Sequence, residues 1–206
     1  MKEHFNKINN FFLFIILIFF SLTINFYYGY RGIFPQDSFF HFDAAYHILN
    51  NRHPFKDFYS ISGIFVDYLQ ATFFYFFGVN WFSYILHAAA INCLLCIFSF
   101  KLFNTLGLTK AYSFVYSIGI SIIAYTSAGS PFVDYHGVIF SLLSIYLLIF
   151  FIIKKNNISL FFLPIFLFLS FLSKQIPAAY IIIFSGLILL LYFIKNFQLK
   201  KIIIFF

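Results

Sequence analysis

Residues 139–153 read IFSLLSIYLLIFFII, fifteen consecutive residues without a charged side chain. Phe11–Phe20 and Ile158–Leu172 are similarly apolar. A helix formed by such a run has no polar face for water to solvate, so it must be surrounded by lipid or by other apolar helices. These runs predict the fold class, which is an all-α integral membrane protein.

The composition of the whole chain supports this class. Hydrophobic residues make up 63% of the chain, aromatic residues 26% and charged residues 9%, whereas globular proteins have about 25% charged residues. This composition excludes an ordinary soluble domain. The net charge is +7, but the basic residues are scattered through loops, so we expect no nucleic-acid partner. Cys93 and Cys96 lie in an apolar segment and are interpreted as small packing residues.

Hydropathy predicts one transmembrane domain over residues 1–206, a polytopic helix bundle with about six transmembrane helices. A long outer loop, residues 30–81, separates the first two helices and holds interfacial helices. The first span is too long for a signal peptide and is not followed by a small-residue cleavage site, so we expect it to be retained. The expected spans lie near residues 10–29, 82–103, 111–128, 137–153, 158–173 and 177–194.

The basic residues predict the orientation, because cytoplasmic loops are enriched in Lys and Arg. With a cytoplasmic N-terminus, nine basic residues fall inside and four outside, and all five aspartates fall outside. We therefore expect an integral protein of a bacterial inner (plasma) membrane. The inside set is Lys2, Lys7, Lys101, Lys110, Lys154, Lys155, Lys195, Lys200 and Lys201, and the outside set is Arg31, Arg52, Lys56 and Lys174.

Two helices are expected in the outer loop. From Ser38 to Leu49 the apolar residues Phe39, Phe42, Tyr46 and Leu49 recur at an approximate helical spacing, which predicts an amphipathic helix on the membrane surface. Residues 64–77 form a second apolar stretch, too short for a span and closed by Gly78, which predicts an interfacial or re-entrant helix.

The C-terminal sequence predicts a truncated chain. After Lys200 and Lys201, residues 202–206 read IIIFF, which resembles the start of a further apolar segment. A short tail that touches the membrane is the alternative interpretation.

The order of these features resembles the start of the GT-C superfamily of polytopic glycosyltransferases, including its protein-mannosyltransferase and aminoarabinose-transferase-like branches. The resemblance covers about residues 10–100. Asp37 stands at the family's early aspartate, Leu49 lies near the helix end, and residues 50–54 form the following turn. Ser38 replaces an acidic neighbour of some branches, and Asn51 stands where glycine is common.

The resemblance implies transfer of a sugar from a polyprenyl-phosphate donor, held in membrane lipid, to a glycan, lipid or protein acceptor at the outer (periplasmic) face. It implies Asp37 as the base that takes the acceptor proton, with Asp43 as the second candidate. A leaving phosphate needs cationic or hydrogen-bonding partners, for which the candidates are Arg52, His53, Lys56 and Lys174. Lys174 is equally well explained as an anchor that reaches the membrane surface.

Other residues and functions stay open. Asp134 and His136 are candidates for a divalent-metal site with Asp37 or Asp43; a capped helix start explains Asp134 equally well, and the sequence requires no cofactor. His87 is interpreted as a hydrogen-bonding residue between packed helices. The alternatives to an enzyme are a transporter component and a non-catalytic membrane scaffold fragment.

Overall fold

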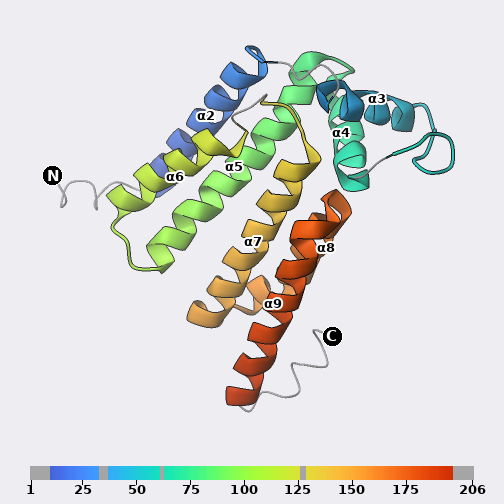
Figure 1. Ribbon diagram of the computed structural model, residues 1–206. Helices are drawn as coiled ribbons and strands as arrows, with labels where there is room; N and C mark the ends of the chain where they lie inside the picture. Colours follow the sequence, from blue (N-terminus) through green and yellow to red (C-terminus); the bar gives the residue numbers. More distant parts are fainter. Residues whose placement is uncertain (1–9, 33–36, 61–62, 126–128, 197–206) are drawn as a thin grey trace.

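The computed structural model describes residues 10–32, 37–60, 63–125 and 129–196. These described residues form eight helices and no strand (Figure 1). The helices are α2 (Asn10–Gly29), α3 (Asp37–Leu49), α4 (Ile64–Phe77), α5 (Trp81–Thr105), α6 (Lys110–Ala124), α7 (Val133–Lys154), α8 (Asn157–Ser173) and α9 (Gln175–Lys195).

Four of these helices, α2, α5, α7 and α9, are long and apolar enough to cross a membrane, as expected for an integral membrane protein. The expected spans at residues 111–128 and 158–173 correspond to α6 and α8, which have 15 and 17 residues. At 1.5 Å per residue these helices are roughly 23 and 26 Å long, compared with about 30 Å of hydrocarbon. The six-span topology therefore stays a prediction, and residues 126–128 of the third expected span lie outside the described residues.

The long helices pack as two groups. One group contains α2, α5 and α6, the other contains α7, α8 and α9, and α5 joins them by packing on α7 (Figure 1). The largest apolar core lies where α5, α7, α8 and α9 meet, and it completely buries Leu143, Leu163 and Phe193. This core holds the second group against α5.

Between α2, α5 and α6 an apolar cluster that includes Leu13, Leu17 and Phe100 lies beside a seam of polar contacts. The Asn92 side-chain amide donates to the Ser121 carbonyl at 3.0 Å, and the Ser121 hydroxyl donates to the Ser21 hydroxyl at 3.0 Å. Cys96 is buried beside this seam, and its thiol donates to the Ser117 carbonyl at 3.4 Å. Small and hydrogen-bonding residues are typical of helix packing in membranes, which agrees with the packing role predicted for the cysteines.

The two helices expected in the long loop are confirmed. The first begins at Asp37, one residue before the predicted start, and ends at Leu49 as expected. The second is α4, with the predicted bounds Ile64–Phe77, and it ends where the Gly78 N–H donates to the Phe74 carbonyl at 2.9 Å. Because α3 and α4 pack against each other and α4 also packs on α5 and α8, the loop is folded onto the end of the bundle.

The face that α3 buries matches the predicted apolar stripe in part, because Phe42 and Leu49 pack against the buried cluster of Ala45, Ala71, Phe74 and Tyr84. Phe39 and Tyr46 are each 48% exposed, whereas Ala44, Ala45 and His41 are buried. The alanines let α3 approach α4 closely, and His41 supplies a polar partner for a carboxylate of α4. Close packing of the alanines and the His41 contact therefore set the rotation of α3 together with Phe42 and Leu49, and this rotation leaves Phe39 and Tyr46 exposed.

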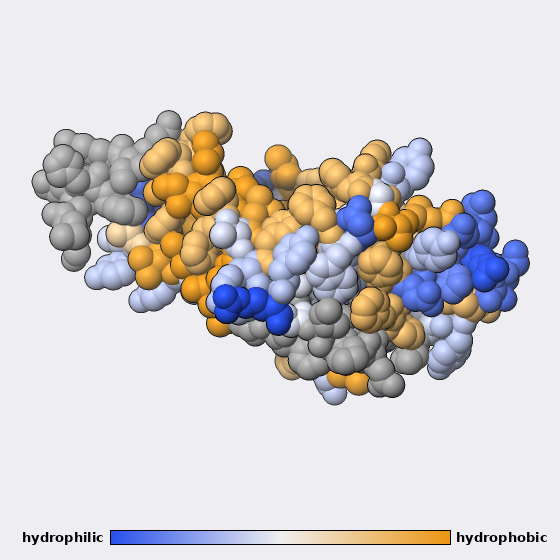
Figure 2. Space-filling view, turned by 90° about the horizontal axis from the view of Figure 1, so that it is seen from above, coloured by the Kyte–Doolittle hydropathy of each residue, from blue (hydrophilic) through white to orange (hydrophobic). Residues whose placement is uncertain are grey.

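The described acidic residues gather at one end of the bundle, where Arg31, Arg52, Lys56 and Lys174 also lie, whereas the described charged residues of the other end are lysines alone. The described acidic side chains, Asp43, Asp57, Asp67 and Asp134, belong to α3, the segment after it, and the first turns of α4 and α7; we call this the α3–α4 end. Lys101, Lys110, Lys154, Lys155 and Lys195 lie where α5, α7 and α9 end and α6 begins, which we call the lysine end. Seen from above, the strongest hydrophilic colour gathers at the edge formed by the segment after α3 (Figure 2).

Candidate functional site

A buried ion-pair geometry joins α3 to α4. The Nδ1 atom of His41 lies 2.6 Å from Oδ1 of Asp67, and the Ser60 hydroxyl donates to Oδ2 of the same carboxyl at 3.3 Å. His41 and Asp67 are 2% and 0% exposed. Buried polar groups require hydrogen-bonding partners, so this contact fixes the distance and rotation between the two helices.

Backbone conformation brings these groups together. Gly63 precedes α4 with φ 80°, a left-handed conformation that residues with a Cβ rarely adopt. A Cβ at this position would collide with the Val133 side chain and lie 3.4 Å from the His41 ring. The glycine therefore allows α4 to start directly beneath α3 and against the first residue of α7.

Burial dominates the electrostatics of Asp67. Removal from water raises the pKa of its carboxyl above the ordinary value, while the hydrogen bond and positive charge of His41 and the Ser60 hydroxyl act in the opposite direction. Desolvation disfavours a charged carboxylate, and a nearby cation favours it. His41 and Ser60 therefore offset part of the effect of burial on this carboxyl.

A second set of polar side chains continues from α4 into α5 and α7. Nδ1 of His87 lies 2.9 Å from Oε1 of Gln70, and Nε2 of His87 lies 3.0 Å from Nε2 of His136. Nδ1 of His136 lies 2.9 Å from the Phe132 carbonyl oxygen. Gln70, His87 and His136 are each 0% exposed, so the chain is sealed from solvent, and the predicted helix-packing role of His87 is confirmed.

The direction of each hydrogen bond in the series Gln70–His87–His136–Phe132 follows from the groups at its two ends. A carbonyl only accepts, so Nδ1 of His136 must donate to Phe132. A neutral His136 then accepts at Nε2 from His87, which leaves Nδ1 of His87 as an acceptor. The Gln70 amide has a buried Nε2 without a hydrogen-bond partner, and turning the amide over lets this Nε2 donate to His87. Each of the three contacts then joins one donor to one acceptor, and the series of hydrogen bonds runs in one direction from α4 to α7.

The expected catalytic aspartates occupy different positions on α3. Asp37 begins the helix, one turn before His41, and its side chain lies outside the described part of the structure. Asp43 is exposed, and its Oδ2 lies 3.5 Å from Nε2 of His47. The structure thus places both positions on the helix that the His41–Asp67 contact anchors, and Asp43 faces solvent.

The expected phosphate-binding residues fall into two places. Arg52, His53 and Lys56 are exposed in the segment after α3. The His53 ring lies 3.1 Å from the Tyr68 hydroxyl, and its backbone N–H donates to Asp57 at 2.8 Å. Lys174 instead lies between α8 and α9 and forms an ion pair with Asp134 of α7.

The expected metal ligands have separate partners. Asp134 pairs with Lys174, whereas His136 bonds to His87 and Phe132. Within the described ranges, no group of three or more His, Cys, Asp or Glu side chains is positioned to hold a metal ion.

Sequence reasoning did not select Asp67, His41 and Gln70 as site residues. One signal was present, because Asp67 and Gln70 stand three residues apart on an otherwise apolar helix, where polar side chains at that spacing share a face. His41 gave no comparable signal.

The chain was compared with known proteins, and no family model, no curated protein and no solved structure matches it.

Proposed function

We propose that the protein is a membrane glycosyltransferase that moves a sugar from a polyprenyl-phosphate donor to an acceptor at the outer face of a bacterial inner membrane. The observation that carries the proposal is the arrangement of α3 and α4. These two short helices lie between the first two long helices, at the end of the bundle that holds the described aspartates. The GT-C resemblance implies the same order of elements.

The buried contacts supply a physical reason for this arrangement. A group that takes a proton from an acceptor must be held within hydrogen-bonding reach of it. His41 and Asp67 anchor α3 one turn after Asp37, so they act as positioning residues for the start of the helix. We assign the base to Asp37, with Asp43 as the exposed alternative.

In the proposed reaction, the acceptor hydroxyl oxygen attacks the anomeric carbon of the lipid-linked sugar. The bond between that carbon and the phosphate oxygen breaks, and the polyprenyl phosphate leaves with the bonding electrons. The hydroxyl proton passes to Asp37. The configuration at the anomeric carbon is inverted, because attack and departure occur on opposite sides.

We assign the contacts that stabilise the departing phosphate to the segment after α3. Arg52 and Lys56 are exposed there, and cationic side chains form strong charge-assisted hydrogen bonds to phosphate. Lys174 already has a carboxylate partner in Asp134, so we assign Lys174 to holding α7 against the α8–α9 junction.

A transporter would place ionisable groups near the middle of its spans. His136 is in the first turn of α7 and His87 in the second turn of α5, counted from the α3–α4 end. These positions favour a site near one membrane surface over a pathway through the bilayer.

The test uses the full chain in membranes supplied with polyprenyl phosphates that carry radiolabelled sugars. We expect label to enter glycan, lipid or protein, and Asp37→Asn to reduce the rate by at least about 100-fold, the usual contribution of a general base. Asp57→Asn, which removes another exposed carboxylate of the same loop, is the matched control. Equal rates for Asp37→Asn and the wild type would remove Asp37 as the base, and an absence of transfer from every donor would refute the enzyme.

A further inference from the structure

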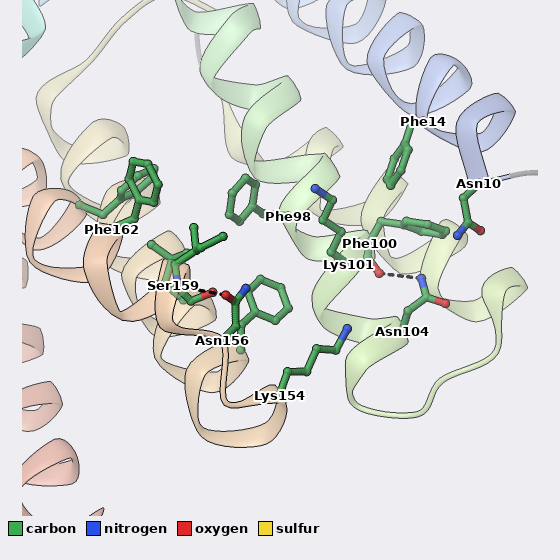
Figure 3. Close-up of a pocket in the computed structure, with 14 residues that line it drawn as sticks. Asn10, Phe14, Phe98, Phe100, Lys101, Asn104, Lys154, Asn156, Ser159 and Phe162 are labelled. Carbon is green, nitrogen blue, oxygen red and sulfur yellow. Dashed lines mark hydrogen bonds between the residues drawn. The ribbon is translucent and has the colours of Figure 1, made fainter. Parts of the chain in front are cut away.

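A cavity at the lysine end opens between the two groups of helices. It has a volume of about 730 Å³, within the range of about 300–1,000 Å³ that is typical of small-molecule sites. The walls come from α2 and α5 on one side and from α7 and α8 on the other (Figure 3). The cavity is thus on the opposite end of the bundle from the candidate site.

Two lysines contribute the charge of this cavity. Lys101 comes from the last part of α5 and Lys154 from the end of α7, and both side chains line the space (Figure 3). The Lys101 ammonium lies 5.7 Å from the Phe14 ring centre and 5.6 Å from that of Phe98. Within the described residues, neither lysine has a carboxylate within ion-pair distance.

The residues that line the cavity include both polar and apolar side chains. The side chains of Asn10, Asn104 and Asn156 line the same cavity as the lysines (Figure 3). The remaining wall is mainly phenylalanine, contributed by Phe14, Phe98, Phe100, Phe150, Phe162 and Phe166. A ligand that fills the cavity must therefore combine a negatively charged head with a hydrocarbon body.

We propose that this cavity binds an anionic phospholipid, with its phosphate between Lys101 and Lys154 and an acyl chain against the phenylalanines. Basic pockets between membrane helices recognise anionic head groups in this way, and the cytoplasmic leaflet is rich in such lipids. The amides donate hydrogen bonds to phosphate and glycerol oxygens. A free phosphate would leave the aromatic wall uncovered, and a zwitterionic lipid would bring a third cation close to the two lysines. The proposal does not depend on the proposed enzymatic activity.

The test is native mass spectrometry of the full chain in a neutral detergent, titrated with phosphatidylglycerol or with phosphatidylcholine of the same acyl chains. We expect phosphatidylglycerol to bind at least about tenfold more tightly. Lys101→Gln combined with Lys154→Gln should weaken phosphatidylglycerol binding by roughly 10- to 30-fold, in line with the usual contribution of a lysine near an anionic surface, and should leave phosphatidylcholine binding unchanged.

The matched control changes two other lysines of the same end. Lys155 lies 6.0 Å from the Tyr192 ring centre, and Lys195 is in the last turn of α9; neither lines the cavity. Lys155→Gln combined with Lys195→Gln should retain tight binding. A separate arm adds glycerol 3-phosphate, which should not compete at the concentrations at which the lipid binds. Equal loss in both double variants, equal affinity for the two lipids, or competition by glycerol 3-phosphate would each overturn the proposed site.

Discussion

Replacing His41 with alanine tests whether the buried contact between α3 and α4 stabilises the fold. The change leaves Asp67, which is 0% exposed, with the Ser60 hydroxyl at 3.3 Å and without its closest partner at 2.6 Å. Removal of one member of a buried ion pair typically costs about 3–5 kcal/mol. We expect the lower end of this range, about 3 kcal/mol at pH 8, because the carboxyl can take up a proton.

The stability of the His41→Ala variant should change with pH in one direction. Burial already raises the pKa of Asp67, and loss of the His41 cation raises it further. A group whose pKa is raised in the folded state contributes stability below its unfolded pKa and loses it as the pH rises through the folded pKa. The His41→Ala variant should therefore become less stable from about pH 4 upward, more steeply than the wild type.

The assay is thermal unfolding of the purified protein in detergent between pH 4 and pH 8. A loss of about 3 kcal/mol corresponds to a decrease in Tm of roughly 6–12 °C for a chain of this size. Asp67→Asn keeps the shape without the charge and is the matched control, and the double variant His41→Ala/Asp67→Asn should be more stable at pH 8 than His41→Ala alone. An unchanged Tm for His41→Ala at pH 8, or an equal pH dependence in His41→Ala and Asp67→Asn, would refute the reasoning.

Two further predictions concern the start of α4 and the orientation of the chain. Gly63→Ala should destabilise the protein by about 2 kcal/mol or more, because Gly63 has φ 80° and a Cβ would collide with the Val133 side chain. The control is Gly119→Ala, where a Cβ meets nothing within 4 Å; it should be neutral or stabilise the protein by up to about 1 kcal/mol. Similar changes in Tm for the two variants would contradict this prediction. Ser38→Cys, in a background without Cys93 and Cys96, should react with an impermeant thiol reagent added outside intact cells; labelling only after permeabilisation would reverse the proposed orientation.

The elements of this fold could be predicted from sequence where the signal is local. The apolar run 64–77 and Gly78 predicted the bounds of α4, and the apolar spacing from Ser38 to Leu49 predicted α3 to within one residue. The rotation of α3 could not be predicted in the same way. Periodicity placed Phe39, Phe42 and Tyr46 on one side of the helix, but alanine packing and the His41–Asp67 contact rotate α3 so that only Phe42 of the three packs on the core.

Contacts between residues far apart in the sequence could not be predicted from the sequence. His87 and His136 are 49 residues apart, and their pairing follows from how α5 packs on α7. The cavity at the lysine end likewise depends on the divergence of two helix groups whose sequences are uniformly apolar. Sequence identified Lys101 and Lys154 only as members of a cytoplasmic set, because their proximity is a property of packing and not of spacing.

The lysine end carries five lysines and no described acidic residue, so the bundle has an uneven distribution of charge on which an electric field acts. An energised bacterial membrane is negative inside, and the field acts on each elementary charge with about 2.3 kcal/mol per 100 mV. With the lysine end inside, the voltage opposes the exit of that end from the cell. An inverted copy would have to carry the same cations outward against the voltage. In the orientation that we propose, the membrane voltage thus acts in the same direction as the distribution of lysines and holds the lysine end inside.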